Sequence, residues 1–326
     1  MKAVVCTRYG SPDVMQLRDV LKPVPKPNEV LVKIHTATVT AGDCEIRKFH
    51  IPVLFWLPLR IILGITKPRI GILGQEYAGE VEAVGDKVSG LHKGDSVFGA
   101  TTIRLGAYAQ YITLPESYVN RFPLEKMTYE VAVTIPTGGI NGLHFVRMSK
   151  IKVGVKVLIN GAGGSIGTYA VQFAKSRGPE VTCVDSVNKL PMLRVLGADA
   201  VVDYMQKDFT RDGKTYDVII DIVGNSSFSR SVKSLNPKGR YVLGNPTLAG
   251  MLRGFFTSLT SNKKIISRFA DYKKEAFDFI SKEMVNGKLK SVIDRRFTLD
   301  QLPEAHRYVD AGLKAGNVII LIDHPQ

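Results

Sequence analysis

Cysteine is scarce in this chain: among 326 residues there are three, Cys6, Cys44 and Cys183. They are too far apart for the paired spacing of a metal site or a disulfide framework, and this scarcity is typical of a reducing compartment. Residues 1–8 lack the apolar core and the small-residue cleavage site of a secretory signal. We therefore expect a cytoplasmic protein without structural disulfides.

Acidic residues are outnumbered, with 30 Asp and Glu against 44 Lys and Arg, and the formal net charge is +14. A field of this sign attracts anions such as nucleotide phosphates, nucleic acid and acidic membranes. No RNA-binding module is visible, and the basic residues do not alternate with aromatic residues as a base-stacking surface requires. The charge therefore favours solubility and phosphate binding, and nucleic acid is not an expected partner.

Apolar runs long enough to span a membrane are also lacking. Residues 51–65 (IPVLFWLPLRIILGI) are intensely apolar, but the segment is too short and contains Pro58 and Arg60. Residues 246–264 are similar, with apolar residues around Arg253 and Lys263. Each segment could be a packed loop or an interface helix, a wall of a hydrophobic substrate cleft, or a surface for peripheral membrane contact. Membrane contact is the least favoured of the three.

What the chain does have is a glycine cluster between a β-like run and a helix-patterned segment, in residues 157–171 (VLINGAGGSIGTYAV). A dinucleotide needs a tight turn, a bare backbone for its pyrophosphate and a helix N-terminus directed at it. The spacing, Gly161-x-x-Gly164-x-x-Gly167, is a variant of the usual fingerprint. This order favours dinucleotide binding over a plain glycine turn, or over a doubly wound domain that binds another ligand.

The downstream residues continue an alternation of helices and strands. A helix is predicted over 166–176, and a strand over 180–185 ends at Asp185. An acidic residue about 20 positions after the glycines can bind both hydroxyls of the adenosine ribose, which favours NAD over NADP. Further strands are predicted at 200–203, 216–223 and 240–243, apolar as in a parallel sheet that is covered on both faces.

The flanking regions differ from this alternation. Short strands are predicted at 1–6, 29–39, 80–84 and 108–114, with turn residues between them. This pattern favours a compact barrel over another βαβ unit. Near the end of the chain we expect helices over 271–286 and 299–315 and a last strand over 317–322.

Together these pieces resemble the medium-chain dehydrogenase/reductase superfamily, and more narrowly its zinc-free quinone-oxidoreductase branch, over almost the whole chain. The resemblance implies an α/β fold of two domains. A GroES-like, β-rich catalytic domain (residues 1–122 and 264–326) is interrupted by a Rossmann domain with a doubly wound parallel sheet (residues 123–263). The matching pieces are residues 1–5 (MKAVV), 74–81 (GQEYAGEV), 94–99 (GDSVFG), 106–109 (GAYA), the glycine cluster and 196–199 (LGAD).

The resemblance also shows where zinc-dependent relatives hold their metal. They place a cysteine at the position of Thr40, a histidine at that of Gln75 and a third ligand near Thr137. A hydroxyl or an amide is a poor substitute for thiolate, imidazole or carboxylate, so we expect no zinc and no metal site. Asp43 and Glu76, which lie beside the zinc in those relatives, are expected to be structural hydrogen-bond partners.

Without zinc, alcohol oxidation lacks its activator, whereas hydride donation to a quinone or an enone remains feasible because these acceptors delocalise the developing charge. The protein must then supply hydrogen-bond donors and a proton. By the resemblance, Thr40, Gln75 and Thr137 are the expected donors. Tyr108 is a candidate proton donor, as is Tyr77, although packing roles are favoured for both tyrosines.

The type of cofactor is contested by the residues themselves. Asp185 argues for NADH, whereas Ser186, Lys189 and Tyr204 match positions that hold the 2′-phosphate of NADPH in relatives, and Lys189 can supply the charge. Three positions match the NADPH-binding relatives and only Asp185 differs from them, so NADPH is the expected cofactor and NADH the alternative. The expected cofactor-binding residues are Asn141, Gly161, Gly163, Gly164, Ser165, Ile166, Gly167, Asp185, Ser186, Lys189, Tyr204, Val223 and Gly244.

Three classes of function remain. The leading one is an NAD(P)H-dependent reductase of quinones or α,β-unsaturated carbonyls, acting on a small hydrophobic substrate. The others are a zinc-free alcohol or aldehyde oxidoreductase and a nucleotide-binding protein that serves interactions. The resemblance further implies a homodimer joined through the edge of the nucleotide domain, and the strand at 240–243 is a candidate for that edge.

Overall fold

The structure of the protein is a computed structural model that describes residues 1–50, 53–69 and 71–324, with the side chains of 53–55 and 59 excepted. The chain divides into two compact units. Unit 1 comprises Met1–Thr137, Lys274–Lys288 and Ile293–Gln326, and unit 2 comprises Gly138–Lys273 and Leu289–Val292. The sequence suggested a Rossmann domain over residues 123–263. In the structure, residues 123–137 belong to unit 1 and residues 264–273 belong to unit 2.

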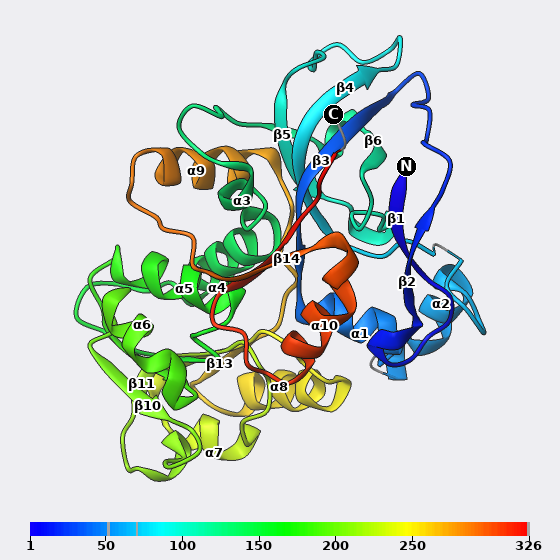
Figure 1. The fold of residues 1–326 in the computed structure, drawn as a ribbon. Coiled ribbons are helices and arrows are strands. Elements are labelled where there is room, and N and C mark those ends of the chain that lie inside the picture. Colours follow the sequence, from blue (N-terminus) through cyan, green and yellow to red (C-terminus); the bar gives the residue numbers. More distant parts are fainter. Residues whose placement is uncertain (51–52, 70, 325–326) are drawn as a thin grey trace. The chain divides into compact units, whose positions relative to one another are not determined.

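Unit 1 is rich in β structure (Figure 1). In its described residues, seven strands form one sheet in the order β14-β15-β3-β4-β5-β7, with β6 paired to β3, and β1 and β2 form a separate antiparallel pair. The pairs within the large sheet are antiparallel except β14 with β15. The strands are β1 Lys2–Cys6, β2 Met15–Asp19, β3 Glu29–Val39, β4 Glu76–Val84, β5 Ser96–Ala100, β6 Tyr111–Pro115, β7 Asn120–Arg121, β14 Ile293–Thr298 and β15 Asn317–Leu321.

Strand β3 is the centre of this sheet, because it pairs with β4, β6 and β15. Its β-branched and aliphatic side chains are buried, and Val30, Val32 and Ile34 are among the least exposed in the core of unit 1. The strand ends at Val39, and the next residue, Thr40, caps helix α1. The residue predicted to replace a metal ligand is therefore held at the junction of a buried strand and a helix.

Five α-helices accompany these strands in the described part of unit 1. The predicted helix over 299–315 is shorter in the structure, since it ends at Asp310 and Gly312 then adopts a positive φ of 71° that terminates it. The helices are α1 Ala41–Lys48, α2 Val53–Leu63, α3 Tyr129–Ala132, α9 Lys274–Val285 and α10 Leu302–Asp310.

Unit 2 contains a six-stranded sheet whose pairs are all parallel, in the order β10-β9-β8-β11-β12-β13. Numbered along the chain this is 3-2-1-4-5-6, the order of a doubly wound dinucleotide-binding fold, with its switch point between β8 and β11. The strands are β8 Lys156–Asn160, β9 Glu180–Asp185, β10 Ala200–Asp203, β11 Tyr216–Asp221, β12 Leu235–Leu243 and β13 Lys264–Ile266. The helices are α4 Ile140–Ser149, α5 Ser165–Lys175, α6 Leu190–Val195, α7 Phe228–Lys233 and α8 Leu248–Thr260.

The prediction that residues 240–243 form an edge of this sheet is wrong. Residues 240–243 lie in β12, which pairs on one side with β11 and on the other with β13, so in the described residues β10 and β13 form the edges. Strand β13 has three residues, and its sequence, Lys-Ile-Ile, is too short to show an alternation pattern.

The two apolar segments fold as helices and not as loops. Residues 53–63 form α2, and residues 248–260 form α8; Ile51 and Pro52 of the first segment lie outside the described residues. In α2 the Arg60 guanidinium lies over the rings of Phe49, Tyr9 and Trp56 at 3.9, 4.7 and 5.1 Å from the ring centres. Among the helices that the structure describes, none combines the length and the apolar character needed to cross a membrane.

Candidate active site

The glycine loop of unit 2 follows β8 at the carboxyl edge of the sheet. Gly161 has φ of 79°, and a Cβ there would lie 2.4 Å from Val223 Cγ2. A Cβ at Gly167 would lie 2.3 Å from the Gly161 carbonyl oxygen. Both positions therefore require glycine, the first for the turn and for the approach of Val223, the second for the packing of α5 against the loop.

Gly164 differs from these two glycines. It is the N-cap of α5 with φ of −87°, and a Cβ there would have the Gly161 carbonyl oxygen, 3.8 Å away, as its one neighbour within 4 Å. Ser165, Ile166 and Gly167 form the first turn of the helix beside this open position. Backbone N–H groups and the helix dipole favour an anion at such an N-terminus. The loop thus fits a pyrophosphate at Gly164.

Asp185 is turned toward this loop and is buried. Its carboxylate accepts hydrogen bonds from the N–H groups of Gly163 at 2.7 Å and Ser186 at 2.8 Å, and forms an ion pair with Lys189 at 3.1 Å. Tyr204 is half exposed, and its N–H donates to the Asp185 carbonyl oxygen at 3.3 Å. The acidic residue and the lysine that were expected to favour different cofactors therefore neutralise each other.

The other predicted cofactor residues lie at the same edge of the sheet or along α4. Val223 is beside Gly161, and a Cβ at Gly244 would lie 2.8 Å from Ile222 Cα. Asn141 on α4 donates from Nδ2 to the hydroxyl of Tyr272 at 3.1 Å. The structure thus brings the glycine loop, Val223 and Gly244 together at the end of the central strands.

Asp221, which sequence analysis did not single out, holds this edge together. It is fully buried and accepts hydrogen bonds from Asn160 Nδ2 and the Gly224 N–H at 2.9 Å each, from the Tyr241 hydroxyl at 2.9 Å, and from the Ser226 hydroxyl. These donors come from the two neighbouring strands, β8 and β12, and from the loop after β11. The signal was an acidic residue at the end of an apolar strand, a position where a buried carboxylate needs several donors.

A second cluster lies in unit 1 at the start of α1. The Thr40 hydroxyl donates to Asp43 Oδ2 at 2.6 Å, and it accepts from the Asp43 N–H at 3.1 Å and from Gln75 Nε2 at 3.3 Å. A Cβ at Gly42 would lie 2.9 Å from Gln75 Nε2, so glycine is what lets the amide approach. The structure therefore brings Thr40 and Gln75 together and places the Asp43 carboxylate on the Thr40 hydroxyl.

Thr137 joins the neighbouring carboxylate. Its N–H donates to Glu76 Oε1 at 2.5 Å, and the Thr38 hydroxyl donates to Glu76 Oε2. Thr38 also accepts, through its carbonyl oxygen, the hydrogen bond of the Tyr108 hydroxyl at 3.1 Å. Thr40, Gln75, Thr137 and Tyr108 thus lie around two buried carboxylates.

The tyrosines have the features of packing residues. Tyr108 and Tyr77 are fully buried, and each hydroxyl donates to a backbone carbonyl oxygen, that of Thr38 and that of Tyr118. Burial raises the pKa of both phenols above the usual range. A hydroxyl committed to a carbonyl oxygen, with its ionisation disfavoured, is a weak candidate for proton donation to a substrate.

Both carboxyl groups have raised pKa values. Burial raises the pKa of Asp43, and the hydrogen bonds from Thr40 offset part of that effect. Burial also raises the pKa of Glu76 to about 7, with a further contribution from the charge of Asp43 and opposition from the hydrogen bonds of Thr38 and Thr137. Two adjacent buried carboxyls resist ionising together, so this cluster can hold a proton near neutral pH.

The donor atoms here do not fit zinc. At the three metal-ligand positions the chain has the Thr40 hydroxyl, which is already bonded to Asp43, the Gln75 amide and Thr137. Zinc requires thiolate, imidazole or carboxylate ligands in tetrahedral geometry. Among the residues that the structure describes, no three His, Cys, Asp or Glu side chains are grouped so as to hold a metal ion.

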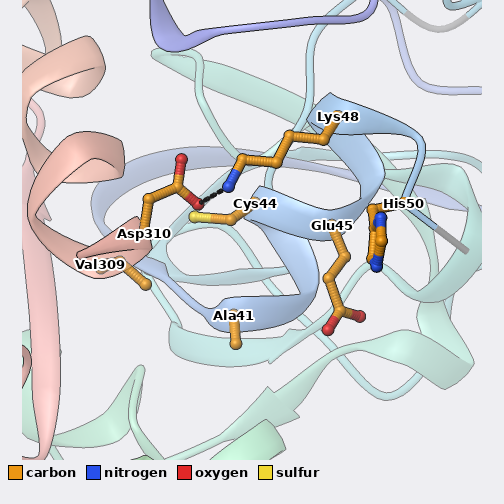
Figure 2. A pocket seen from close by; sticks show the side chains of 7 residues that line it. All are labelled: Ala41, Cys44, Glu45, Lys48, His50, Val309 and Asp310. Carbon is orange, nitrogen blue, oxygen red and sulfur yellow. Dashed lines mark ion pairs between the residues drawn. The ribbon is translucent and has the colours of Figure 1, made fainter. Parts of the chain in front are cut away.

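A cavity of about 350 Å³ lies along α1 and beside α10. Figure 2 shows the Lys48 ammonium and the Asp310 carboxylate paired across it, at 2.7 Å. Burial raises the pKa of the Cys44 thiol well above its usual range, and burial lowers the pKa of its neighbour His306 to about 3. The thiol therefore stays protonated and is no activated nucleophile. The lining residues are Ala41, Cys44, Glu45, Lys48, His50, Val309 and Asp310.

Comparisons with known proteins agree with this architecture. A family model described as "Alcohol dehydrogenase GroES-like domain" matches residues 26–124, and one described as "Zinc-binding dehydrogenase" matches residues 196–320. The chain is 29% identical to 2-methylene-furan-3-one reductase of Solanum lycopersicum, over 100% of this chain and 79% of that protein. It is 27% identical to quinone oxidoreductase of Homo sapiens, over 99% of this chain and 98% of the relative.

Among solved structures, the quinone oxidoreductase from Coxiella burnetii aligns with a TM-score of 0.89 and 26% identity over 99% of both chains. The chain therefore belongs to the medium-chain dehydrogenase/reductase superfamily, a class of oxidoreductases. Within it, the protein is a member of the quinone-oxidoreductase-like branch. The predicted pairing of a GroES-like domain with a Rossmann domain is confirmed, and the family implies a cofactor of the NAD(P)H type.

Proposed function

We propose that the protein is an NAD(P)H-dependent reductase of quinones or α,β-unsaturated carbonyls that works without zinc. The observation that carries this proposal is the cluster at Thr40, where a hydroxyl and the Gln75 amide are hydrogen-bonded above a buried carboxyl at the positions of metal ligands in zinc-dependent relatives. Such a cluster can donate hydrogen bonds to an acceptor oxygen, but it cannot stabilise an alkoxide as a metal does.

When bound, the reduced nicotinamide supplies the hydride. The chain must then polarise the acceptor oxygen and deliver a proton. We assign the contact with that oxygen to Thr40, and Gln75 supports the orientation of the Thr40 hydroxyl by donating to it at 3.3 Å. Asp43, at 2.6 Å from the same hydroxyl, is the proposed source of the proton through Thr40.

Steady-state turnover tests this function. We expect the purified protein to reduce a quinone and an enone with NADPH, to oxidise alcohols at least about a hundredfold more slowly, to contain no stoichiometric zinc and to keep its activity after treatment with a chelator. One tightly bound zinc per chain together with loss of turnover on chelation would overturn the zinc-free mechanism. Alcohol as the preferred substrate would favour the dehydrogenase alternative, and no turnover with any of the three would favour an interaction protein.

The same purified protein tests the proposed homodimer. Strand β13 is an edge of the parallel sheet in the described residues and presents backbone groups that a second copy can pair with. A mass of one chain by light scattering at all concentrations would contradict the dimer.

Gly164→Asp should weaken cofactor binding by at least about tenfold, or about 1.4 kcal/mol. The side chain would enter the open position beside the N-terminus of α5, where its carboxylate repels a pyrophosphate. The fold should stay intact because, among the described residues outside its own helix and chain neighbours, the Gly161 carbonyl oxygen at 3.8 Å is the one atom within 4 Å of the added Cβ. Titration of NADPH fluorescence measures the affinity. Gly164→Ala is the matched control and should bind much more tightly than the aspartate variant; equal affinities for the two variants and the wild type would show that the phosphates bind elsewhere.

The choice of cofactor should depend on the Asp185–Lys189 pair. Asp185→Asn keeps an oxygen to accept from the Gly163 N–H but removes the charge that neutralises Lys189. We expect the ratio of NADPH to NADH affinity to rise by roughly tenfold, since a charged hydrogen bond to the 2′-phosphate contributes about 1–3 kcal/mol. Lys189→Ala should lower NADPH affinity and spare NADH. Dissociation constants of both cofactors decide the matter, and an unchanged ratio in both variants would refute this placement of the adenosine end.

A further inference from the structure

Helix α8 packs against unit 2 with its small residues. Gly254 is buried, and a Cβ there would lie 2.8 Å from Ile265 Cγ2. Ser258 accepts a hydrogen bond from the Ile265 N–H at 2.9 Å through its hydroxyl oxygen. The side of α8 that meets the domain therefore has no room for large side chains, and the helix contributes little of its apolar surface to the core of unit 2.

The large apolar residues of α8 point to solvent instead. They recur at positions i, i+4, i+7, i+8 and i+11, which places them on one side of the helix, and their exposed fractions range from 48% to 66%. A surface helix of a soluble domain normally buries such a stripe, so this orientation is the reverse of the usual one. We call this surface the α8 apolar face; it consists of Leu248, Leu252, Phe255, Phe256 and Leu259.

The chain segment that contains this face carries charges of one sign. Residues 222–270 contain eight Lys or Arg and no Asp or Glu. Lys264 and Arg268, just after the helix, are exposed, and Lys263 is held nearby by a hydrogen bond from its ammonium to the Val232 carbonyl oxygen at 2.6 Å. On α8 itself, Arg253 donates to the Ser229 hydroxyl oxygen at 2.6 Å. Of the eight cations, Arg230 is paired with Asp208 at 3.3 Å. An apolar stripe flanked along the chain by Arg253, Lys263, Lys264 and Arg268 is complementary to a surface that is apolar within and anionic at its rim.

We propose that the α8 apolar face docks on an anionic phospholipid bilayer, with the helix lying in the plane of the interface. Its phenylalanine and leucine side chains would enter the acyl boundary while the cations of residues 253–268 face the headgroups. A helix of 13 residues is too short to span the bilayer, which agrees with an interfacial position. A second copy of the chain is the competing occupant, because β13, the edge proposed for the homodimer, follows α8 in the chain.

Vesicle flotation with the full chain tests the proposal. The protein should bind vesicles that contain phosphatidylserine and should not bind vesicles of phosphatidylcholine alone. Phe255→Ser with Phe256→Ser should weaken binding by roughly tenfold or more, since two exposed rings are lost. Matched pairs locate the surface: Leu252→Ser should weaken binding whereas Leu313→Ser, at the same 54% exposure, should not. Lys264→Glu should weaken it more than Lys152→Glu, which makes the same change of net charge elsewhere in unit 2.

Several results would overturn the proposal. Binding to neither kind of vesicle, or equal binding to both, contradicts the proposal. Binding that high salt removes but that the double serine variant does not change would indicate simple electrostatic adsorption of a basic protein. A dimer that the double variant dissociates, in the absence of vesicle binding, would assign the face to a second copy. Binding to nucleic acid through the same residues would likewise replace the bilayer as the partner. Circular dichroism of each variant confirms that the fold is retained.

Discussion

Replacing Asp43 with Asn should lower kcat for a quinone or an enone by about a hundredfold or more and should leave KM nearly unchanged, since general acid catalysis contributes about 10²–10⁴-fold. The reason lies in the hydrogen bonds of Thr40. Its hydroxyl donates to Asp43 Oδ2 at 2.6 Å and already accepts from Gln75. Once Asp43 carries a proton, it can donate to Thr40, and the Thr40 hydrogen becomes available to the substrate oxygen. An amide at position 43 can orient Thr40 but cannot release that proton.

Variants of Thr40 and the pH profile separate this role from a structural one. Thr40→Ser keeps the hydroxyl and the helix cap and should retain most of kcat, whereas Thr40→Val loses both, with about 1 kcal/mol of stability from the cap. Because burial raises the pKa of Asp43, the wild-type kcat should fall as pH rises through that pKa, and the Asp43→Asn profile should be flat there. If Asp43→Asn keeps the full kcat and the wild-type profile, the proton comes from water or another group.

The sequence predicted the order of the nucleotide-binding unit because glycine spacing and apolar strands are local patterns. It did not distinguish the glycines by role. At position 167 only glycine fits, because a Cβ would lie 2.3 Å from the Gly161 carbonyl oxygen, whereas a Cβ at position 164 would point into open space. That difference depends on how the loop closes on itself, which spacing does not encode.

Side-chain pairing was the part that the sequence could not provide. Asp185 and Lys189 were assigned to different cofactors, and in the structure they form one ion pair. Asp43 was expected to be a structural partner, and it is bonded directly to the candidate catalytic hydroxyl. Strand β13 was missed because three residues are too few for a pattern. Each of these depends on contacts that form when the sheet and its loops assemble.

Glu76 should make the stability of the protein fall between about pH 4.5 and 7. Burial and the neighbouring Asp43 raise its pKa from 4.5 to about 7, so in this interval the folded state holds a proton that the unfolded state has released. The contribution of this group is therefore fully present below pH 4.5 and is lost as pH rises through about 7. A shift of this size corresponds to about 3 kcal/mol in the free energy of unfolding.

Glu76→Gln tests this expectation because the amide oxygen can accept from the Thr137 N–H and the amide nitrogen can donate to the Thr38 hydroxyl oxygen, and neither titrates. Urea unfolding at a series of pH values should show the variant gaining about 3 kcal/mol on the wild type between pH 4.5 and above 7. The comparison must be a difference between proteins, since His306, whose pKa burial lowers to about 3, acts in the opposite direction over part of the range. Glu275→Gln, at an exposed position, is the control and should run parallel to the wild type. If Glu76→Gln also runs parallel, Glu76 is ionised throughout, and the buried pair at the candidate active site holds its proton on Asp43 alone.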